Sequence, residues 1–163
     1  MKKVLVAGIG NIFLGDDGFG VEVIGRLAGR PLPEGVELGD FGIRGLDLAY
    51  ALMDGYDAAI LVDAMPLGQP AGTVSLVEPD TDQLDGFGLV ESHAMDPVQV
   101  LRLVKQMGGA LPADLFLVGC EPADFGPEEG LMGLSEVVAA AVQPAADKVM
   151  ELLQRLTAGL EVS

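Results

Sequence analysis

The chain has 163 residues, half of them hydrophobic, which is enough for a single domain, residues 1–163, with a sizeable core. The formal net charge of −16 and a pI of about 4.1 argue against nucleic acid or an anionic membrane as a partner. Cys120 is the only cysteine, so no intrachain disulfide can form and a reducing, cytoplasmic location is expected. The apolar run behind Met1-Lys2-Lys3 is too short for a signal peptide, and no stretch is apolar enough to span a membrane. We expect the protein to be a monomer.

In chain order, an apolar run at 3–7 predicts a buried strand, and a Gly-rich turn and a helix at 20–27 follow it. The later patterns predict a strand at 36–41, a helix at 46–53, strands at 58–62 and 73–77, a helix at 98–107, a strand at 114–119 and a helical stretch at 134–156. Asp96 and Pro97 form a strong start signal for the helix at 98–107. Pro144 marks either a kink or the first position of a second helix.

The alternation of strands and helices predicts an α/β fold, a three-layer α/β/α sandwich with a mostly parallel sheet of about five strands. The strand at 73–77 is expected to be antiparallel, because the loop before it is too short for a helical crossover. In such a fold the ligand crevice lies at the carboxyl ends of the parallel strands.

The turn after the first strand has the glycine spacing of an anion site but carries acids. Gly10 and Gly15 are spaced as in a phosphate-binding loop, yet Asp16 and Asp17 stand where that loop has Lys and a hydroxyl residue. Two carboxylates repel a phosphate. Phe13 also replaces the third glycine of a dinucleotide-binding fingerprint, so the turn predicts a cation as its ligand and disfavours a nucleotide-binding domain.

Both acids of this turn also suit helix capping, since Asp is a preferred N-cap and a carboxylate is favourable at a helix N-terminus. We expect Asp16 to cap the following helix and Asp17 to face a site.

Two further residues complete a candidate constellation. Asp63 directly follows the apolar run at 58–62, so it should share an edge of the sheet with Asp17, although an acid there can also cap a turn. His93 is the only histidine and lies in a polar loop, where it is either a ligand or a packed residue. Two carboxylates and one imidazole suit a divalent transition metal such as nickel or zinc, and three ligands leave positions open for sharing the metal.

A nucleophile triad fits the sequence poorly. Cys120 ends an apolar strand and is expected to be a small buried hydrophobe rather than a nucleophile. Arg44, in the second Gly-rich turn, either binds a carboxylate or forms a surface salt bridge, and the salt bridge is expected.

The opening motif, Gly8-Ile9-Gly10-Asn11 followed by Asp16-Asp17 before a helix, resembles that of the hydrogenase maturation endopeptidases. The resemblance continues almost end to end through Ile60-Leu61-Val62-Asp63-Ala64, Pro70-Ala71-Gly72-Thr73, Glu91-Ser92-His93 and Val118-Gly119-Cys120-Glu121-Pro122. One departure is the second Gly-rich turn, Asp40-Phe41-Gly42-Ile43, which often reads Asp-Gly-Gly-Thr in that family.

The resemblance implies an endopeptidase that removes the C-terminal extension of the nickel-loaded large-subunit precursor of a nickel–iron hydrogenase. It also implies that Asp17, Asp63 and His93 are the catalytic and metal-contacting residues, and that nickel arrives with the precursor and is bound transiently. The alternative is a nickel-sensing binding module that reads the precursor without cleaving it.

Overall fold

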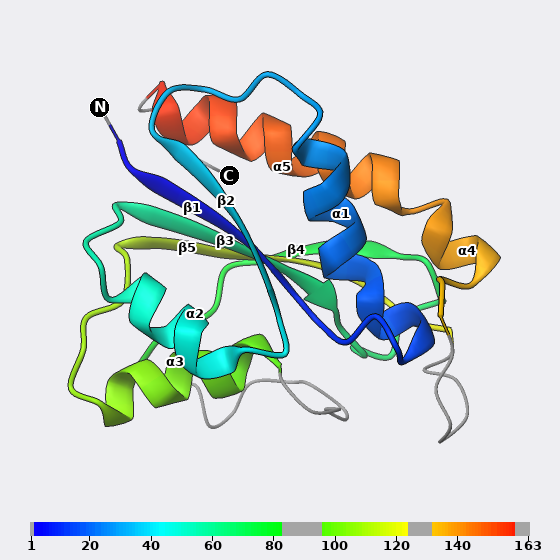
Figure 1. Cartoon of the computed structure of the whole chain (residues 1–163), viewed down its shortest axis with the longest axis horizontal. Coiled ribbons are helices and arrows are strands. Elements are labelled where there is room, and N and C mark those ends of the chain that lie inside the picture. Colours follow the sequence, from blue (N-terminus) through cyan, green and yellow to red (C-terminus); the bar gives the residue numbers. More distant parts are fainter. Residues whose placement is uncertain (1, 83–95, 124–131, 159–163) are drawn as a thin grey trace.

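Five strands form one sheet in the order β2-β1-β3-β5-β4 within the residues that the computed structural model describes, 2–82, 96–123 and 132–158 (Figure 1). Their bounds are β1 Val4–Ile9, β2 Val36–Gly42, β3 Ala58–Ala64, β4 Val74–Val77 and β5 Asp114–Cys120. All neighbouring pairs are parallel except β4 and β5, which are antiparallel. The predicted sheet, including its one antiparallel strand, is therefore confirmed.

Two helices cover each face of this sheet, as the three-layer prediction requires. The helices α1 (Phe19–Leu27) and α5 (Val142–Thr157) lie on one face, and α2 (Gly45–Leu52) and α3 (Pro97–Gln106) lie on the other (Figure 1). Successive strand residues supply both cores, because Val6 packs under α1 and α5 whereas its neighbour Leu5 packs under α2 and α3. Burial of each such side chain contributes roughly 1.5–3 kcal/mol of folding free energy.

The helices begin and end close to where the sequence predicts them. Asp96 caps α3 by accepting a hydrogen bond from Gln99 N at 2.8 Å, and Pro97 occupies the first turn. The long C-terminal pattern divides into α4 (Glu136–Ala139) and α5, and Pro144 lies in the first turn of α5, where no i−4 hydrogen bond is lost. None of the helices within the described ranges is long and apolar enough to cross a lipid bilayer.

The glycines Gly8 and Gly20 let α1 approach the sheet closely. A Cβ added to Gly8 would lie 2.6 Å from the carbonyl oxygen of Gly20, and one added to Gly20 would overlap the carbonyl oxygen of Val62. Backbone therefore meets backbone where α1 crosses β1 and β3, and no larger residue fits at either position.

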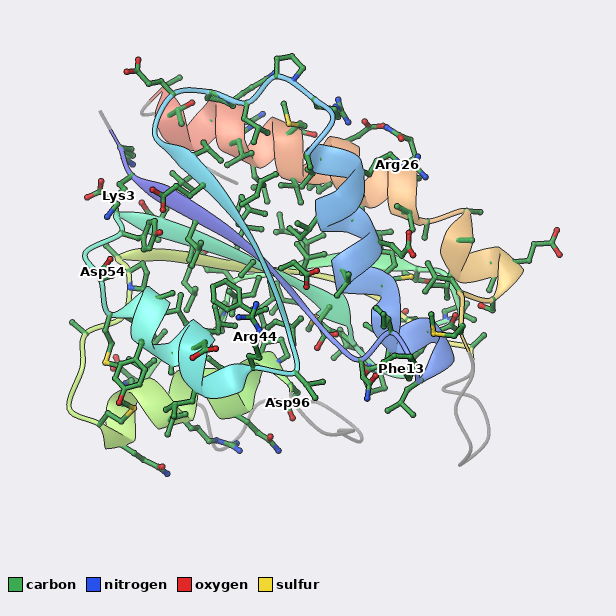
Figure 2. All side chains as sticks on the ribbon, viewed as in Figure 1. Lys3, Phe13, Arg26, Arg44, Asp54 and Asp96 are labelled. Carbon is green, nitrogen blue, oxygen red and sulfur yellow. The ribbon has the colours of Figure 1, made fainter. Side chains whose placement is uncertain are left out.

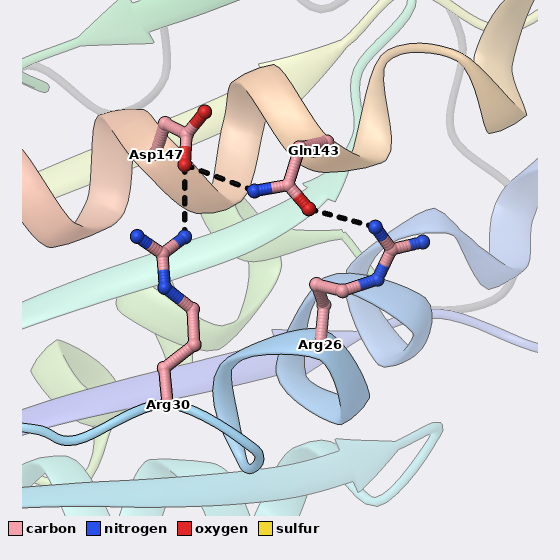
Figure 3. Close-up of polar contacts among 4 residues, drawn as sticks. All are labelled: Arg26, Arg30, Gln143 and Asp147. Atoms are coloured by element: carbon pink, nitrogen blue, oxygen red, sulfur yellow. Dashed lines mark hydrogen bonds and ion pairs between the residues drawn. The ribbon is translucent and has the colours of Figure 1, made fainter.

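Polar side chains join α1 and the turn after it to α5 at the rim of the same layer (Figure 3). Arg26 donates to Gln143 Oε1 at 2.7 Å, Arg30 pairs with Asp147 at 2.8 Å, and Gln143 donates to Asp147 at 3.0 Å. The Arg30 guanidinium lowers the pKa of the Asp147 carboxyl. Since these side chains are largely in water, they orient the helix pair more than they stabilise it.

Candidate functional site

The carboxyl ends of β1 and β3 lie side by side and bring two predicted site residues to one edge of the sheet. The two strands pair in parallel register from Val4 with Ala58 to Gly8 with Val62. Asp63 is the penultimate residue of β3 rather than the first residue of a loop, so its backbone is fixed by pairing with Gly119 of β5. It is 2% exposed.

Asp17 lies in a short 3-10 helix, η1 (Gly15–Gly18), between β1 and α1. Its side chain is 4% exposed, and Oδ2 accepts a hydrogen bond from Asn11 N at 2.9 Å. Asn11 in turn accepts from Phe13 N through its side-chain oxygen, an Asx turn that shapes the loop. The turn therefore holds the Asp17 carboxylate through its own backbone.

Gly10 packs against both acids. Its φ of 131° is in the region that L side chains rarely adopt. A Cβ there would overlap the carbonyl oxygen of Asp17 and stand 3.2 Å from Asp63 Oδ1. The absence of a side chain at this position is thus what allows η1 to close down on the end of β3.

The proximity of these carboxylates shows in the electrostatics of Asp63. Burial raises the pKa of the Asp63 carboxyl well above its ordinary value, and the negative charge of Asp17 raises it further. The hydrogen bond from Ala64 N at 2.8 Å lowers this pKa, and the charge of Asp96 raises it by a smaller amount. Two buried like charges at one edge are unfavourable alone, and a divalent cation between them would relieve the repulsion.

The prediction that Asp16 caps a helix is wrong. Neither η1 nor α1 has a side-chain N-cap, and Asp16 is fully buried. Its Oδ2 accepts from Ala123 N at 2.8 Å and from the Ser135 hydroxyl at 2.9 Å, while Oδ1 accepts from Ser135 N at 2.6 Å. Asp16 instead joins η1 to the segments that follow β5 and precede α4, because its carboxylate satisfies their backbone donors.

Two other acids at this edge were not predicted as part of the site. Asp96 was expected only as a helix cap, yet its negative charge also raises the pKa of Asp63. Glu121, the residue after β5, is 9% exposed and accepts with Oε1 from Leu67 N at 2.8 Å and Gln69 N at 3.0 Å. An acid directly after a parallel strand, as in Cys120-Glu121, is the sequence signal that could have found it.

The third predicted site residue, His93, lies outside the described residues. Within the ranges that are described, no three His, Cys, Asp or Glu side chains are grouped as a metal site. The pair formed by Asp17 and Asp63 is thus the part of the predicted constellation that the structure brings together.

Cys120 and Arg44 behave as expected from the sequence. Cys120 is fully buried, and burial raises the pKa of its thiol to about 12, with smaller contributions from the charges of Asp16 and Glu121. A thiol in this state is not a nucleophile at neutral pH. The Arg44 side chain is 60% exposed and lies 3.5 Å from Asp47, a surface salt bridge.

Comparison with known proteins agrees with the fold. The family model described as hydrogenase maturation protease (HycI) matches residues 21–152. The hydrogenase 2 maturation protease of Escherichia coli is 30% identical over 154 residues, which cover 93% of this chain and 91% of that protein.

Solved structures show the same likeness. The hydrogenase maturating endopeptidase HybD from E. coli superposes with a TM-score of 0.78 at 29% identity, covering 94% of this chain and 93% of the other. The hydrogenase 2 maturation peptidase from a Thaumarchaeota archaeon superposes with a TM-score of 0.70 at 34% identity, covering 93% and 98%. With the family match extending over most of its length, this chain belongs to the hydrogenase maturation protease family.

Proposed function

We propose that the chain is an endopeptidase that removes the C-terminal extension from the nickel-loaded large-subunit precursor of a nickel–iron hydrogenase. Family membership supports the reaction class. The observation that carries the proposal is the pair of buried carboxylates, Asp17 and Asp63, at one edge of the sheet, where Gly10 packs against both residues.

Nickel carried by the precursor suits this pair. Carboxylate oxygens and an imidazole are acceptable ligands for Ni²⁺, and a set of three leaves positions for ligands from the precursor itself. Burial and the negative charge of Asp17 raise the pKa of Asp63, and a divalent cation at this position would offset both effects. We therefore assign Asp17, Asp63 and His93 as the residues that contact the substrate's nickel.

Two chemical routes to peptide hydrolysis are compatible with these groups. In one, nickel polarises the scissile carbonyl as a Lewis acid. In the other, one of the carboxylates activates a water molecule as a general base. In both, the rigid end of β3 positions Asp63, and the Asn11 N–H orients Asp17.

The test is mass spectrometry of a large-subunit precursor incubated with the full chain, with and without nickel loading. We expect a released C-terminal peptide only from the loaded precursor. Precursor that is bound but stays intact would instead identify a nickel-sensing binding module, and cleavage that is independent of nickel would contradict metal-based recognition.

Variants assign the residues in the same assay. We expect Asp17→Asn, Asp63→Asn and His93→Ala each to abolish processing without unfolding the protein. Asp82→Asn is the matched control, because the Asp82 side chain is 93% exposed and forms a surface pair with Lys105 at 3.6 Å. A His93→Ala variant that processes normally would remove the imidazole from the site and leave the carboxylates alone.

A further inference from the structure

A hollow of about 240 Å³ lies between the two Gly-rich turns, beside the carboxylate pair. The turn after β1 contributes Ile12 and Phe13, the turn after β2 contributes Gly42 and Ile43, and Val21 of α1 also lines it. Figure 2 shows Phe13 on the turn that leads into α1, at the end of the sheet where β1 finishes. The proposed chemistry does not use this hollow.

The side chains around the hollow leave apolar surface in water. Ile12 is 39% exposed, Phe13 is 60% exposed and Ile43 is 56% exposed. Of the eight large hydrophobic side chains that are exposed within the described residues, five lie on the first turn, on the second turn or on the helix that follows it: Ile12, Phe13, Ile43, Leu46 and Tyr50. Such gathering of exposed apolar side chains is typical of an interaction surface.

The walls of the hollow are held in place before any ligand arrives. Gly10 N donates to the carbonyl oxygen of Gly42 at 2.9 Å, which ties one turn to the other. Gly42 has a φ of 55°, a conformation that a larger residue adopts only with strain. Preformed walls reduce the entropy lost when a ligand binds.

The hollow borders the carboxylate pair. Asn11, which also lines the hollow, donates its N–H to Asp17, and Gly10 separates the hollow from Asp63 Oδ1. Since an extended peptide advances about 3.3 Å per residue, a peptide held over the two carboxylates would place a side chain one or two residues away in the hollow.

We propose that this hollow receives one apolar side chain of the precursor, from a residue beside the bond that is cut, and so helps to select the substrate. The inference rests on the proposed function. The lining of the hollow favours an apolar side chain, and the nearby Asp17, Asp40 and Asp63 disfavour an acidic one. Its volume exceeds the roughly 150 Å³ that accommodates benzene but is below the about 300 Å³ of small-molecule sites, so it suits a single large side chain.

The test is a double-mutant cycle on the full chain and an intact nickel-loaded large-subunit precursor. Ile43→Ser opens one wall of the hollow, and each apolar residue within three positions of the cut is replaced by serine in the precursor. Both kcat/KM for release of the C-terminal peptide and Kd for the intact precursor are measured. The control is Met107→Ser, which removes an apolar side chain of 38% exposure at the C-terminal end of α3, at the opposite edge of the sheet.

We expect Ile43→Ser to lower kcat/KM by roughly tenfold or more, the scale of losing apolar contacts in a pocket. One precursor substitution should cause a similar loss, and the two together should cost no more than either alone. Met107→Ser should process at the wild-type rate, and the melting temperatures should match.

The pocket proposal would be overturned if Ile43→Ser kept the wild-type kcat/KM, or if its fold loss and that of every precursor substitution multiplied in the double variants. Either result would leave the peptidase function intact. If the wild type binds the precursor without cutting it, the proposed function fails. The same double-mutant cycle, measured as Kd for the intact precursor, then still tests whether the hollow binds an apolar side chain. A wild-type chain that neither binds nor cuts refutes both. Wild-type dimers that Ile43→Ser abolishes, with processing unchanged, would assign the surface to self-association instead.

Discussion

Asp16 accepts two hydrogen bonds from Ser135, one from its backbone N at 2.6 Å and one from its hydroxyl at 2.9 Å, across 119 positions of sequence. A third bond comes from Ala123 N at 2.8 Å. Both carboxylate oxygens therefore accept from backbone N–H groups in a fully buried position. The neighbouring acid, Asp17, accepts a hydrogen bond from its own turn and raises the pKa of Asp63, so two adjacent aspartates have different partners.

We expect Asp16→Asn to destabilise the protein by roughly 1–3 kcal/mol, since one backbone N–H would then face an amide NH₂ group instead of an oxygen. Asp17→Asn can keep an oxygen toward Asn11 N and should retain a near-wild-type melting temperature. Thermal unfolding and the processing assay distinguish the two variants. Asp16→Asn with unchanged stability would contradict the structural role of Asp16.

Asp63→Asn should raise stability at neutral pH although it abolishes processing, because it removes a buried charge and keeps an acceptor for Ala64 N. We expect a rise in melting temperature of at least about 2 °C, which corresponds to about 1 kcal/mol in a domain of this size. The experiment is thermal unfolding of metal-free protein in chelator.

The pH dependence of that difference has a defined sign. The pKa of Asp63 is raised on folding from 3.8, so the wild type is penalised increasingly as the pH rises from 3.8 to the folded pKa. The advantage of Asp63→Asn should therefore be smallest in acid, grow through this window and stay constant above it. An advantage that shrinks with rising pH would show that Asp63 is stabilised as a carboxylate.

Cys120 should resist alkylation in the native protein. With a thiol pKa of about 12 instead of 9.0, the thiolate fraction at pH 8 falls about a thousandfold, and burial also blocks the reagent. Iodoacetamide followed by mass spectrometry should leave the native chain unmodified and label the chain in guanidinium. Rapid native labelling, or lost processing in a folded Cys120→Ala variant, would reopen the case for a nucleophilic thiol.

Glu121 should stabilise the turn after β3 through the hydrogen bonds that its side-chain oxygen accepts, more than through its negative charge. Its Oε1 accepts from both Leu67 N and Gln69 N, and an amide oxygen can do the same. We expect Glu121→Gln to keep the wild-type melting temperature, whereas Glu121→Ala loses about 1–3 kcal/mol and is cleaved faster between 65 and 72 in limited proteolysis. Equal behaviour of the two variants would mean that this carboxylate does not anchor the turn.

The parts of the molecule that sequence reasoning predicted are those with local causes. The apolar run at 58–62 becomes β3 because alternate residues reach both cores, and Asp96 with Pro97 begins α3 as capping geometry requires. Asp17 and Asp63 could be placed at one edge because parallel strands align their carboxyl ends.

The parts that it missed depend on contacts between distant segments. Asp16 resembles a cap locally, but its partners, Ala123 and Ser135, are over a hundred residues away. Glu121 likewise binds a turn more than fifty positions earlier. Local sequence preferences do not indicate which backbone N–H groups of distant segments will donate to a buried carboxylate in the folded chain.

The close approach of α1 to the sheet bears on how related sequences are interpreted. Gly8 and Gly20 are required by crowding of the backbone, whereas we propose that the chemistry depends on the side chains of Asp17 and Asp63. If that proposal holds, a related sequence that kept both glycines and exchanged Asp17 and Asp63 for neutral residues would have the same fold without protease activity. The two glycines therefore indicate the shared fold, and an inactive relative would be recognised by the loss of the two acids.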